Sequence, residues 1–285
     1  MTSPVGDGRL GRHFVGHDPL SRNFGVRELL PAVVRKPTFW GLPDGPFPLD
    51  QGPDGACTGF GMAQELAAGP VMFPNIDNAY GRARYRRNQE EDRAMGNNFP
   101  DGATVLATMK AAKADALITE YRWCFGVDDC VDTLCSTGPV CLGIDWLNNM
   151  FTTSPEGRVD VSGPVAGGHF IDLLAYDVHP MWGPAVAWVN SWGFSYGVAE
   201  PRLNLHKGIG WLTLPDLATL LARDGEAVVP ADYFIPKVAP YFAGSTRATT
   251  FHDAHPGVRR YREFQRYQDA VDAGLRPCRI CKPQP

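Results

Sequence analysis

The sequence predicts an α+β fold of two lobes, with a functional site in the cleft between them. After residue 45, the first stretch of the chain shows the apolar periodicity of helices. The stretch after residue 117 contains short apolar runs that are typical of buried strands. A cysteine at the start of a helical pattern lies in the first stretch, and a histidine and an asparagine beside apolar runs lie in the second.

The helical lobe contains three predicted helices. The first covers residues 58–68 and is ended by Gly69 and Pro70. The second covers 78–91, where mixed charges indicate a solvated helix face. The third covers 102–114, and Asp101 and Gly102 supply the turn and cap that precede it.

The second lobe is predicted to consist of short strands separated by turn residues. We expect strands at 119–124, 140–144, 170–176, 185–189 and 208–213, with short helices at 127–136 and 215–222. The histidine then lies at the start of one strand and the asparagine at the end of the next.

Cys57 ends the glycine-rich turn that begins at Asp50, and a helix follows it directly. A thiol at a helix N-terminus lies among unpaired N–H groups, which favour the nucleophilic thiolate. Gly55 leaves room for a substrate near the sulfur, and the Gln51 amide could stabilise an oxyanion there. The alternative interpretation is a buried structural cysteine.

A cysteine nucleophile needs a base, and the base needs a group that orients it. Gly167-Gly168-His169 supplies the imidazole, and Asn190-Ser-Trp192-Gly supplies an amide. These segments, with Gln51-x5-Cys57, together resemble papain-like cysteine peptidases of the bacterial or phage type. The order Cys, His, Asn is the order of the family, and the resemblance covers roughly residues 40–235.

The resemblance implies a two-lobed papain-like fold, in which a helical lobe carries the nucleophile and faces an antiparallel, β-barrel-like lobe. It implies hydrolysis of peptide or isopeptide bonds through an acyl-enzyme, without a cofactor. The implied roles are nucleophile for Cys57, imidazole partner for His169, orienter for Asn190, oxyanion donor for Gln51, and shield of the His169–Asn190 hydrogen bond for Trp192.

Further residues are expected to bind the peptide or protein substrate. They are Gly55, Gly167, Gly168 and Trp192, together with Asp145 and Trp146, which could instead anchor a loop. The chain departs from many family members at Asp54 and Thr58, where those members have a disulfide-forming cysteine and a tryptophan. This departure leaves the catalytic set intact but makes the substrate preference hard to infer.

Bulk properties exclude several classes of partner. The net charge of −4 does not favour nucleic acid, and no apolar run is long enough to span a membrane. The first residues lack the pattern of a secretory signal, so we expect a cytoplasmic or virion-associated protein. Cys124, Cys130, Cys135 and Cys141 are predicted to be buried thiols rather than a disulfide framework.

Three regions are predicted along the chain. Residues 1–45 form a proline-punctuated extended arm with one short helix near 26–30, and 46–237 form the catalytic domain. Residues 238–285 form a tail with a basic amphipathic helix over 258–273. Its Cys278-x2-Cys281 could hold a structural zinc ion with His252 and His255, or could be a simple pair of terminal thiols.

Two other functions remain open from the sequence. The chain could be a catalytically idle module with a structural or binding role in a larger assembly, for example a phage particle. It could also be a thiol amidase or transferase that acts on peptidoglycan, because such enzymes use the same thiol chemistry.

Overall fold

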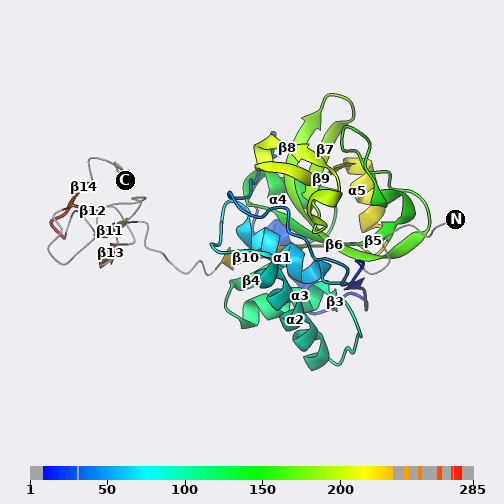
Figure 1. Cartoon of the computed structure of the whole chain (residues 1–285), viewed down its shortest axis with the longest axis horizontal. Helices are drawn as coiled ribbons and strands as arrows, with labels where there is room; N and C mark the ends of the chain where they lie inside the picture. The colour runs from blue at the N-terminus through cyan, green and yellow to red at the C-terminus, as the bar shows by residue number, and fades with distance from the viewer. Residues whose placement is uncertain are drawn as a thin grey trace. The chain divides into compact units, whose positions relative to one another are not determined.

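The structure is a computed structural model that describes residues 9–30 and 32–233, and the shorter pieces 241–243, 250–251, 262–264, 271 and 273–277. The chain divides into two compact units, Met1–Tyr233 and Phe234–Pro285. Among the described residues, all five α-helices and the large sheet belong to the first unit (Figure 1).

The first lobe is built from α1 (Cys57–Ala67), α2 (Asn78–Ala94) and α3 (Val105–Ala114). Every residue of α1 is buried, because the helix is covered on opposite sides by α2 and by the sheet. Glycine makes this close approach feasible. A methyl group at Gly59 would lie 2.3 Å from the Tyr85 nitrogen, and one at Gly61 would lie 2.2 Å from the Phe170 ring.

The third helix begins three residues later than predicted. Its N-cap is Thr104, whose hydroxyl accepts a hydrogen bond from the Ala107 N–H at 3.0 Å. The preceding pair, Ala103–Thr104, forms the short strand β3, which pairs in parallel with β1 (Arg12–His13). Pairing with residues far away in the sequence thus places Ala103 and Thr104 in a strand, although the local pattern assigned them to a helix.

The second lobe is a single sheet of eight strands, with β4 and β8 at the two ends of its order β4-β10-β5-β6-β7-β9-β8 and β2 paired to β6. Neighbouring strands are antiparallel throughout. The strands are β2 (Thr38–Phe39), β4 (Ile118–Cys124), β5 (Val140–Leu147), β6 (Val165–His179), β7 (Gly183–Val189), β8 (Val198–Glu200), β9 (Leu205–Thr213) and β10 (Glu226–Tyr233).

The predicted α+β fold of a helical and a strand lobe is therefore confirmed. The strands β5 and β6 are longer than predicted, because each continues along the other: Asp145 pairs with Gly168, and Trp146 with Gly167. Asp145 and Trp146 consequently lie inside a strand, and His169 lies within β6 rather than at its start.

Two apolar cores lie on the two faces of this sheet. Successive side chains of β6 point to opposite faces of the sheet, as in any strand. Phe170 and Leu174 pack in the core on the side of α1, and Ile171 and Leu173 pack in the core on the other side. There α4 (Val127–Ser136) and α5 (Leu214–Leu221) cover the sheet. Cys124, Cys130, Cys135 and Cys141 are free thiols, as predicted, and only Cys135 is partly exposed.

Where the structure describes it (residues 9–30 and 32–44), the first segment is extended, with 3-10 turns at Ser21–Asn23 and Val26–Glu28. In the tail, Arg262–Phe264 forms β13 and pairs with β11 (Tyr241–Ala243), so the helix predicted over 258–273 is wrong at these residues. Cross-strand pairing here outweighs the local helical pattern. The zinc ligands proposed from the sequence, Cys278, Cys281, His252 and His255, lie outside the described residues.

Two short strands complete the described part of the second unit, β12 (Thr250–Phe251) and β14 (Arg276–Pro277), which pair in parallel. No helix in the described ranges is both long and apolar enough to cross a membrane.

Candidate active site

Cys57 is the first residue of α1 and has no exposed surface. Its sulfur receives hydrogen bonds from three backbone N–H groups, those of Gly11, Phe170 and Thr58. Thr58 belongs to the first turn of the helix, and Phe170 follows His169 directly on β6. The thiol of the helical lobe thus lies against the backbone of the residue that follows the imidazole on the sheet.

His169 is held by Asn190, which directly follows β7. The imidazole Nε2 lies 2.8 Å from the Asn190 Oδ1, and the Ser191 N–H donates to the same oxygen at 2.8 Å. Because this oxygen accepts from Ser191, the Nε2 of His169 carries the proton. The other ring nitrogen, Nδ1, is buried and has no hydrogen-bond partner among the described residues, which leaves its lone pair free to accept a proton.

Two tryptophans enclose the His169 ring. The Trp192 ring lies 4.8 Å from it with an angle of 38° between the planes, where an indole would keep water from the His169–Asn190 hydrogen bond. Trp146 lies at 4.8 Å and 78°. Trp146 is fully buried and also contacts Trp188, so it joins the His169 ring to the core on that face of the sheet.

The Gln51 side chain is fixed in one orientation. Its Oε1 accepts a hydrogen bond from the Ser191 hydroxyl at 2.6 Å, so its Nε2 must point the other way. That nitrogen donates to the carbonyl oxygens of Asp54, at 2.6 Å, and of Arg9, at 2.9 Å. The amide therefore already binds a peptide carbonyl that comes from a distant part of the chain.

The segment Arg9–His13, which we call the occluding segment, covers this site. The Gly11 N–H is bonded to the sulfur, and a methyl group at Gly11 would lie 1.8 Å from the Gly55 carbonyl oxygen. A methyl group at Gly168 would lie 2.0 Å from the Arg12 carbonyl oxygen, and one at Gly167 would lie 3.0 Å from Leu10.

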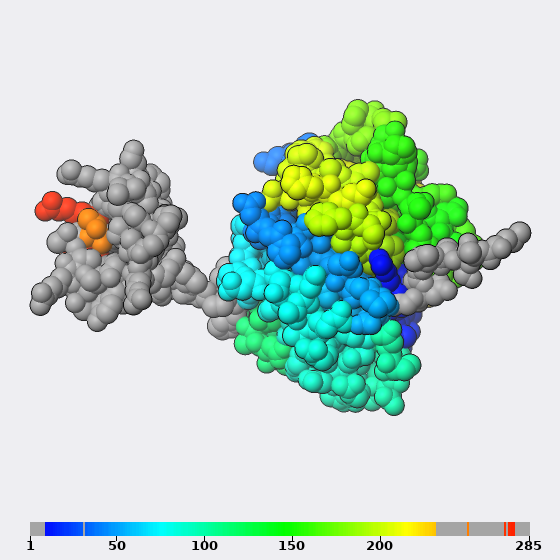
Figure 2. Space-filling view, viewed as in Figure 1, coloured from blue at the N-terminus to red at the C-terminus, as the bar shows by residue number. Residues whose placement is uncertain are grey.

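The three glycines expected to bind substrate thus contact the occluding segment in this structure. The Ala103 N–H donates to the Gly11 carbonyl of the segment at 2.8 Å. Figure 2 shows the first described residues, in the deepest blue, at the surface beside the lighter blue of the chain that carries the nucleophile turn.

Burial under the occluding segment determines the protonation states of Cys57 and His169. Burial raises the pKa of the Cys57 thiol to about 11, although the three N–H groups lower it. Burial lowers the pKa of His169 to about 4, against the opposing effect of Asn190. At neutral pH this conformation holds a thiol and a neutral imidazole. The expected preference of the helix N-terminus for a thiolate is outweighed by exclusion of water.

Arg12 fills a pocket beside the site. Its Nη2 donates to the Glu226 carboxylate at 2.9 Å and to the Asp224 carbonyl at 2.7 Å, and its Nη1 lies 3.9 Å from Asp145. Asp145, which the sequence analysis named, therefore lies beside Arg12, and Glu226 was not identified there. It lies 57 residues beyond His169 in a strand with no catalytic motif, so no local signal identifies it.

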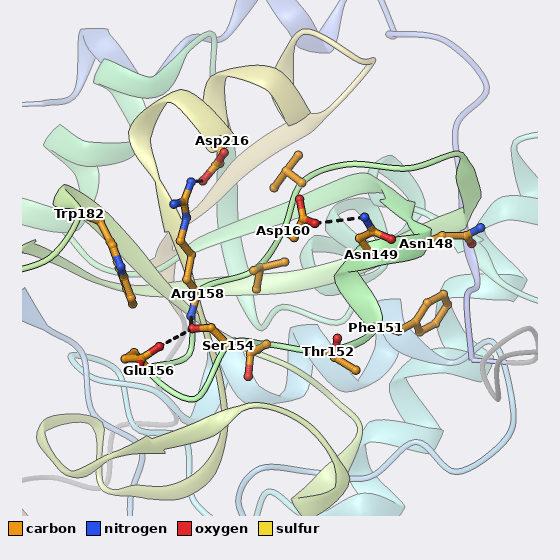
Figure 3. Close-up of a pocket in the computed structure, with 13 residues that line it drawn as sticks. Asn148, Asn149, Phe151, Thr152, Ser154, Glu156, Arg158, Asp160, Trp182 and Asp216 are labelled. Atoms are coloured by element: carbon orange, nitrogen blue, oxygen red, sulfur yellow. Dashed lines mark hydrogen bonds and ion pairs between the residues drawn. The ribbon is translucent and has the colours of Figure 1, made fainter.

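A second feature is an open hollow of about 760 Å³, lined in part by Phe151 and Arg158 (Figure 3). Phe151 lines it and stacks on Trp192, with the ring centroids 5.7 Å apart. Its charged side chains have partners within the hollow: Arg158 bonds to Asp216 at 3.3 Å, Asp160 to Asn149 at 3.1 Å, and Glu156 to Ser154 at 3.0 Å. Neither Cys57 nor His169 lines this hollow.

No protein-family profile matches the chain, and no curated protein matches its sequence. Solved structures of cysteine proteases do match its fold. Xylellain from Xylella fastidiosa has a TM-score of 0.54 at 16% identity, over 81% of this chain and 99% of its own. Procathepsin B from Trypanosoma congolense has a TM-score of 0.52 at 11% identity, over 78% and 86%.

A third match is the proform of the ragweed pollen cysteine protease Amb a 11, with a TM-score of 0.50 and 16% identity over 76% and 72% of the two chains. This chain has the fold of these papain-like proteases. At such identities the likeness establishes the fold alone.

Proposed function

We propose that this chain is a thiol peptidase that hydrolyses peptide or isopeptide bonds, with Cys57 as nucleophile. The observation that carries the proposal is the arrangement around His169. Its Nε2 is held by Asn190 at 2.8 Å, its Nδ1 is left free, and the next residue contacts the Cys57 sulfur. This is the nucleophile, base and orienter relationship of thiol hydrolases.

The reaction begins when the occluding segment leaves the cleft. His169 Nδ1 takes the proton of the Cys57 thiol, and the sulfur attacks the substrate carbonyl carbon. The negative charge that develops on the carbonyl oxygen is stabilised by the Gln51 amide and the Cys57 N–H. The imidazolium then gives its proton to the leaving amine as the carbon–nitrogen bond breaks.

A water molecule completes the cycle. His169 accepts one of its protons while its oxygen attacks the acyl carbon, and the carbon–sulfur bond breaks to release the acid and restore the thiol. Asn190 supports both steps, because it keeps Nε2 protonated and the ring in one orientation. These steps balance with the substrate, one water molecule and the groups of the chain.

The test is modification of Cys57 by a peptidyl epoxide, followed by peptide mapping, with hydrolysis of a casein-derived fluorescent substrate as the second readout. The full chain carrying Arg12→Ala is used, so that the occluding segment binds less tightly. We expect single-site modification at Cys57 that His169→Ala slows by about 100-fold or more, as expected for loss of a general base.

Cys135→Ser is the matched control, because Cys135 is also a free thiol and lies outside the site. It should leave both readouts unchanged. Hydrolysis that survives Cys57→Ala would contradict the proposal. Slow modification spread over several cysteines would also contradict it, and would favour the structural or binding role in an assembly.

A further inference from the structure

The pocket occupied by Arg12 is built as a binding site for a guanidinium group. Two independent acceptors meet its Nη2, the Glu226 carboxylate at 2.9 Å and the Asp224 carbonyl at 2.7 Å, and the Asp145 carboxylate lies 3.9 Å from Nη1. The Arg12 side chain is only 1% exposed and that of Glu226 only 6%. A buried carboxylate is costly unless a cation pairs with it, so this pocket favours a cationic occupant.

The walls of the pocket are shaped for the stem of a long side chain. Gly143 on β5 lies alongside the stem, and a methyl group there would come within 3.4 Å of the Arg12 Cγ and 3.1 Å of its Nε. The same methyl group would meet Val105 of α3 at 2.3 Å, so the absence of a side chain at this position keeps the channel open.

The occupant belongs to a segment that lies in the cleft as a peptide would. The Gly11 N–H is bonded to the Cys57 sulfur, and the Arg12 carbonyl lies against Gly168, the residue before His169. The Gln51 amide binds the Arg9 carbonyl at 2.9 Å. The guanidinium pocket therefore opens into the cleft one residue away from the nucleophile.

We infer that the pocket formed by Glu226, Asp145 and the Asp224 carbonyl selects an arginine side chain in the substrate, close to the bond that is cleaved. This inference rests on the proposed function, because it assumes that a substrate replaces the occluding segment. Glu226 supplies the negative charge at the end of the pocket, and the Arg12 guanidinium occupies the pocket until a substrate replaces it.

Part of the present binding of Arg12 comes from its own segment. The guanidinium carbon lies 4.9 Å from the centroid of the Phe14 ring, and a substrate would lack this contact unless it carries an aromatic residue there. The body of the protein contributes the carboxylates and the carbonyl. Selectivity for a positive charge therefore resides in Glu226 and Asp145 and not in the segment.

The first measurement is binding, made on the full chain with Arg12→Ala and Cys57→Ala to empty the pocket and prevent turnover. Two fluorescent peptides are compared by anisotropy, one with the sequence of residues 9–14 and one with citrulline in place of its second arginine. We expect the arginine peptide to bind about tenfold more tightly or better, since charged hydrogen bonds are lost with citrulline.

Glu226→Gln added to the same chain should abolish the difference between the two peptides. Glu156→Gln, which changes an exposed carboxylate in the open hollow, should preserve it. Equal affinities in the parent chain, or no binding of either peptide, would overturn the inference.

The second measurement is kcat/KM of the Arg12→Ala chain for quenched peptides that carry arginine or citrulline at each position around the cleaved bond. We expect one position at which arginine raises kcat/KM about tenfold, with the preference lost in Glu226→Gln. Efficient cleavage without such a position would overturn the substrate preference while the peptidase proposal stands. No cleavage and no Cys57 labelling would overturn the peptidase proposal, and the binding comparison would still decide whether the pocket selects arginine.

Discussion

The cleft beside His169 and the open hollow beyond Trp192 differ in the origin of the partners that their charged side chains bind. In the cleft, the buried Glu226 finds its cation on the distant Arg12. In the hollow, Arg158 is paired with Asp216 and Asp160 with Asn149, so these charged groups are bonded to other residues of the same hollow. A pocket whose buried carboxylate is hydrogen-bonded to a removable segment is suited to exchange that segment for a ligand.

The difference also has a chemical consequence. The occluding segment excludes water from the reactive groups, which raises the pKa of Cys57 to about 11 and lowers that of His169 to about 4. Substrate access and activation of the thiol are therefore linked, because the same movement that opens the cleft returns both groups to water.

The largest expected effect comes from reversing the charge that holds the occluding segment. Arg12→Glu would place a carboxylate against Glu226 and Asp145, and loss of a buried pair costs about 3–5 kcal/mol. We expect iodoacetamide to modify Cys57 about 100-fold faster or more in this variant. The matched change in the hollow, Arg158→Glu, should alter the rate less than about twofold, since exposed pairs contribute little. An unchanged rate in Arg12→Glu would show that the segment does not limit access to the thiol.

The next effect concerns the orientation of His169. In the Arg12→Glu chain, Asn190→Ala should lower kcat/KM by about 10- to 100-fold, because a misplaced catalytic group loses a factor of this order. Asn149→Ala in the hollow is the control and should leave kcat/KM unchanged. If both variants behave alike, the His169–Asn190 hydrogen bond has no special role in the reaction.

A smaller effect is expected from pH. With the occluding segment in place His169 has a pKa of about 4, and in an open cleft its pKa should be nearer the ordinary 6.5. The open form therefore binds a proton more strongly, so the closed form is fully favoured above pH 6.5 and loses stability as the pH falls toward 4.

Between pH 7 and pH 5 the fraction of open chain should rise by about 20-fold in the unmodified sequence. It can be followed by brief labelling of Cys57 with a pH-insensitive thiol reagent, with Arg12→Glu as the reference that is open at both values. Labelling that does not increase in acid would contradict this linkage.

The smallest effect should come from the hollow itself. The Asp216 carboxylate accepts from the Thr213 hydroxyl at 2.7 Å and forms a capping box at the start of α5. Asp216→Ala should therefore lower the free energy of unfolding by about 1 kcal/mol, as measured by urea titration. Because the hollow is not linked to the occluding segment, Cys57 labelling should not change. A faster labelling rate would mean that the two regions are coupled.

Much of the candidate site could be identified from sequence because its residues come with local patterns. Cys57 follows a glycine-rich turn at the start of a helix, and His169 and Asn190 border apolar runs that form adjacent strands. The two-lobed α+β class follows from the same periodicities. The substrate and the roles of individual residues were not decided in this way, and they stay proposals.

Only the tertiary structure decided what occupies the cleft. Residues 1–45 were expected to form an extended arm around the fold, but no local pattern tells where Gly11 and Arg12 will lie. Their positions depend on pairing with Ala103 and Thr104, and on an ion pair with Glu226 that is 214 residues away in the sequence. The protonation of Cys57 follows from that placement, because burial is a property of the folded chain and not of the helix that carries the thiol.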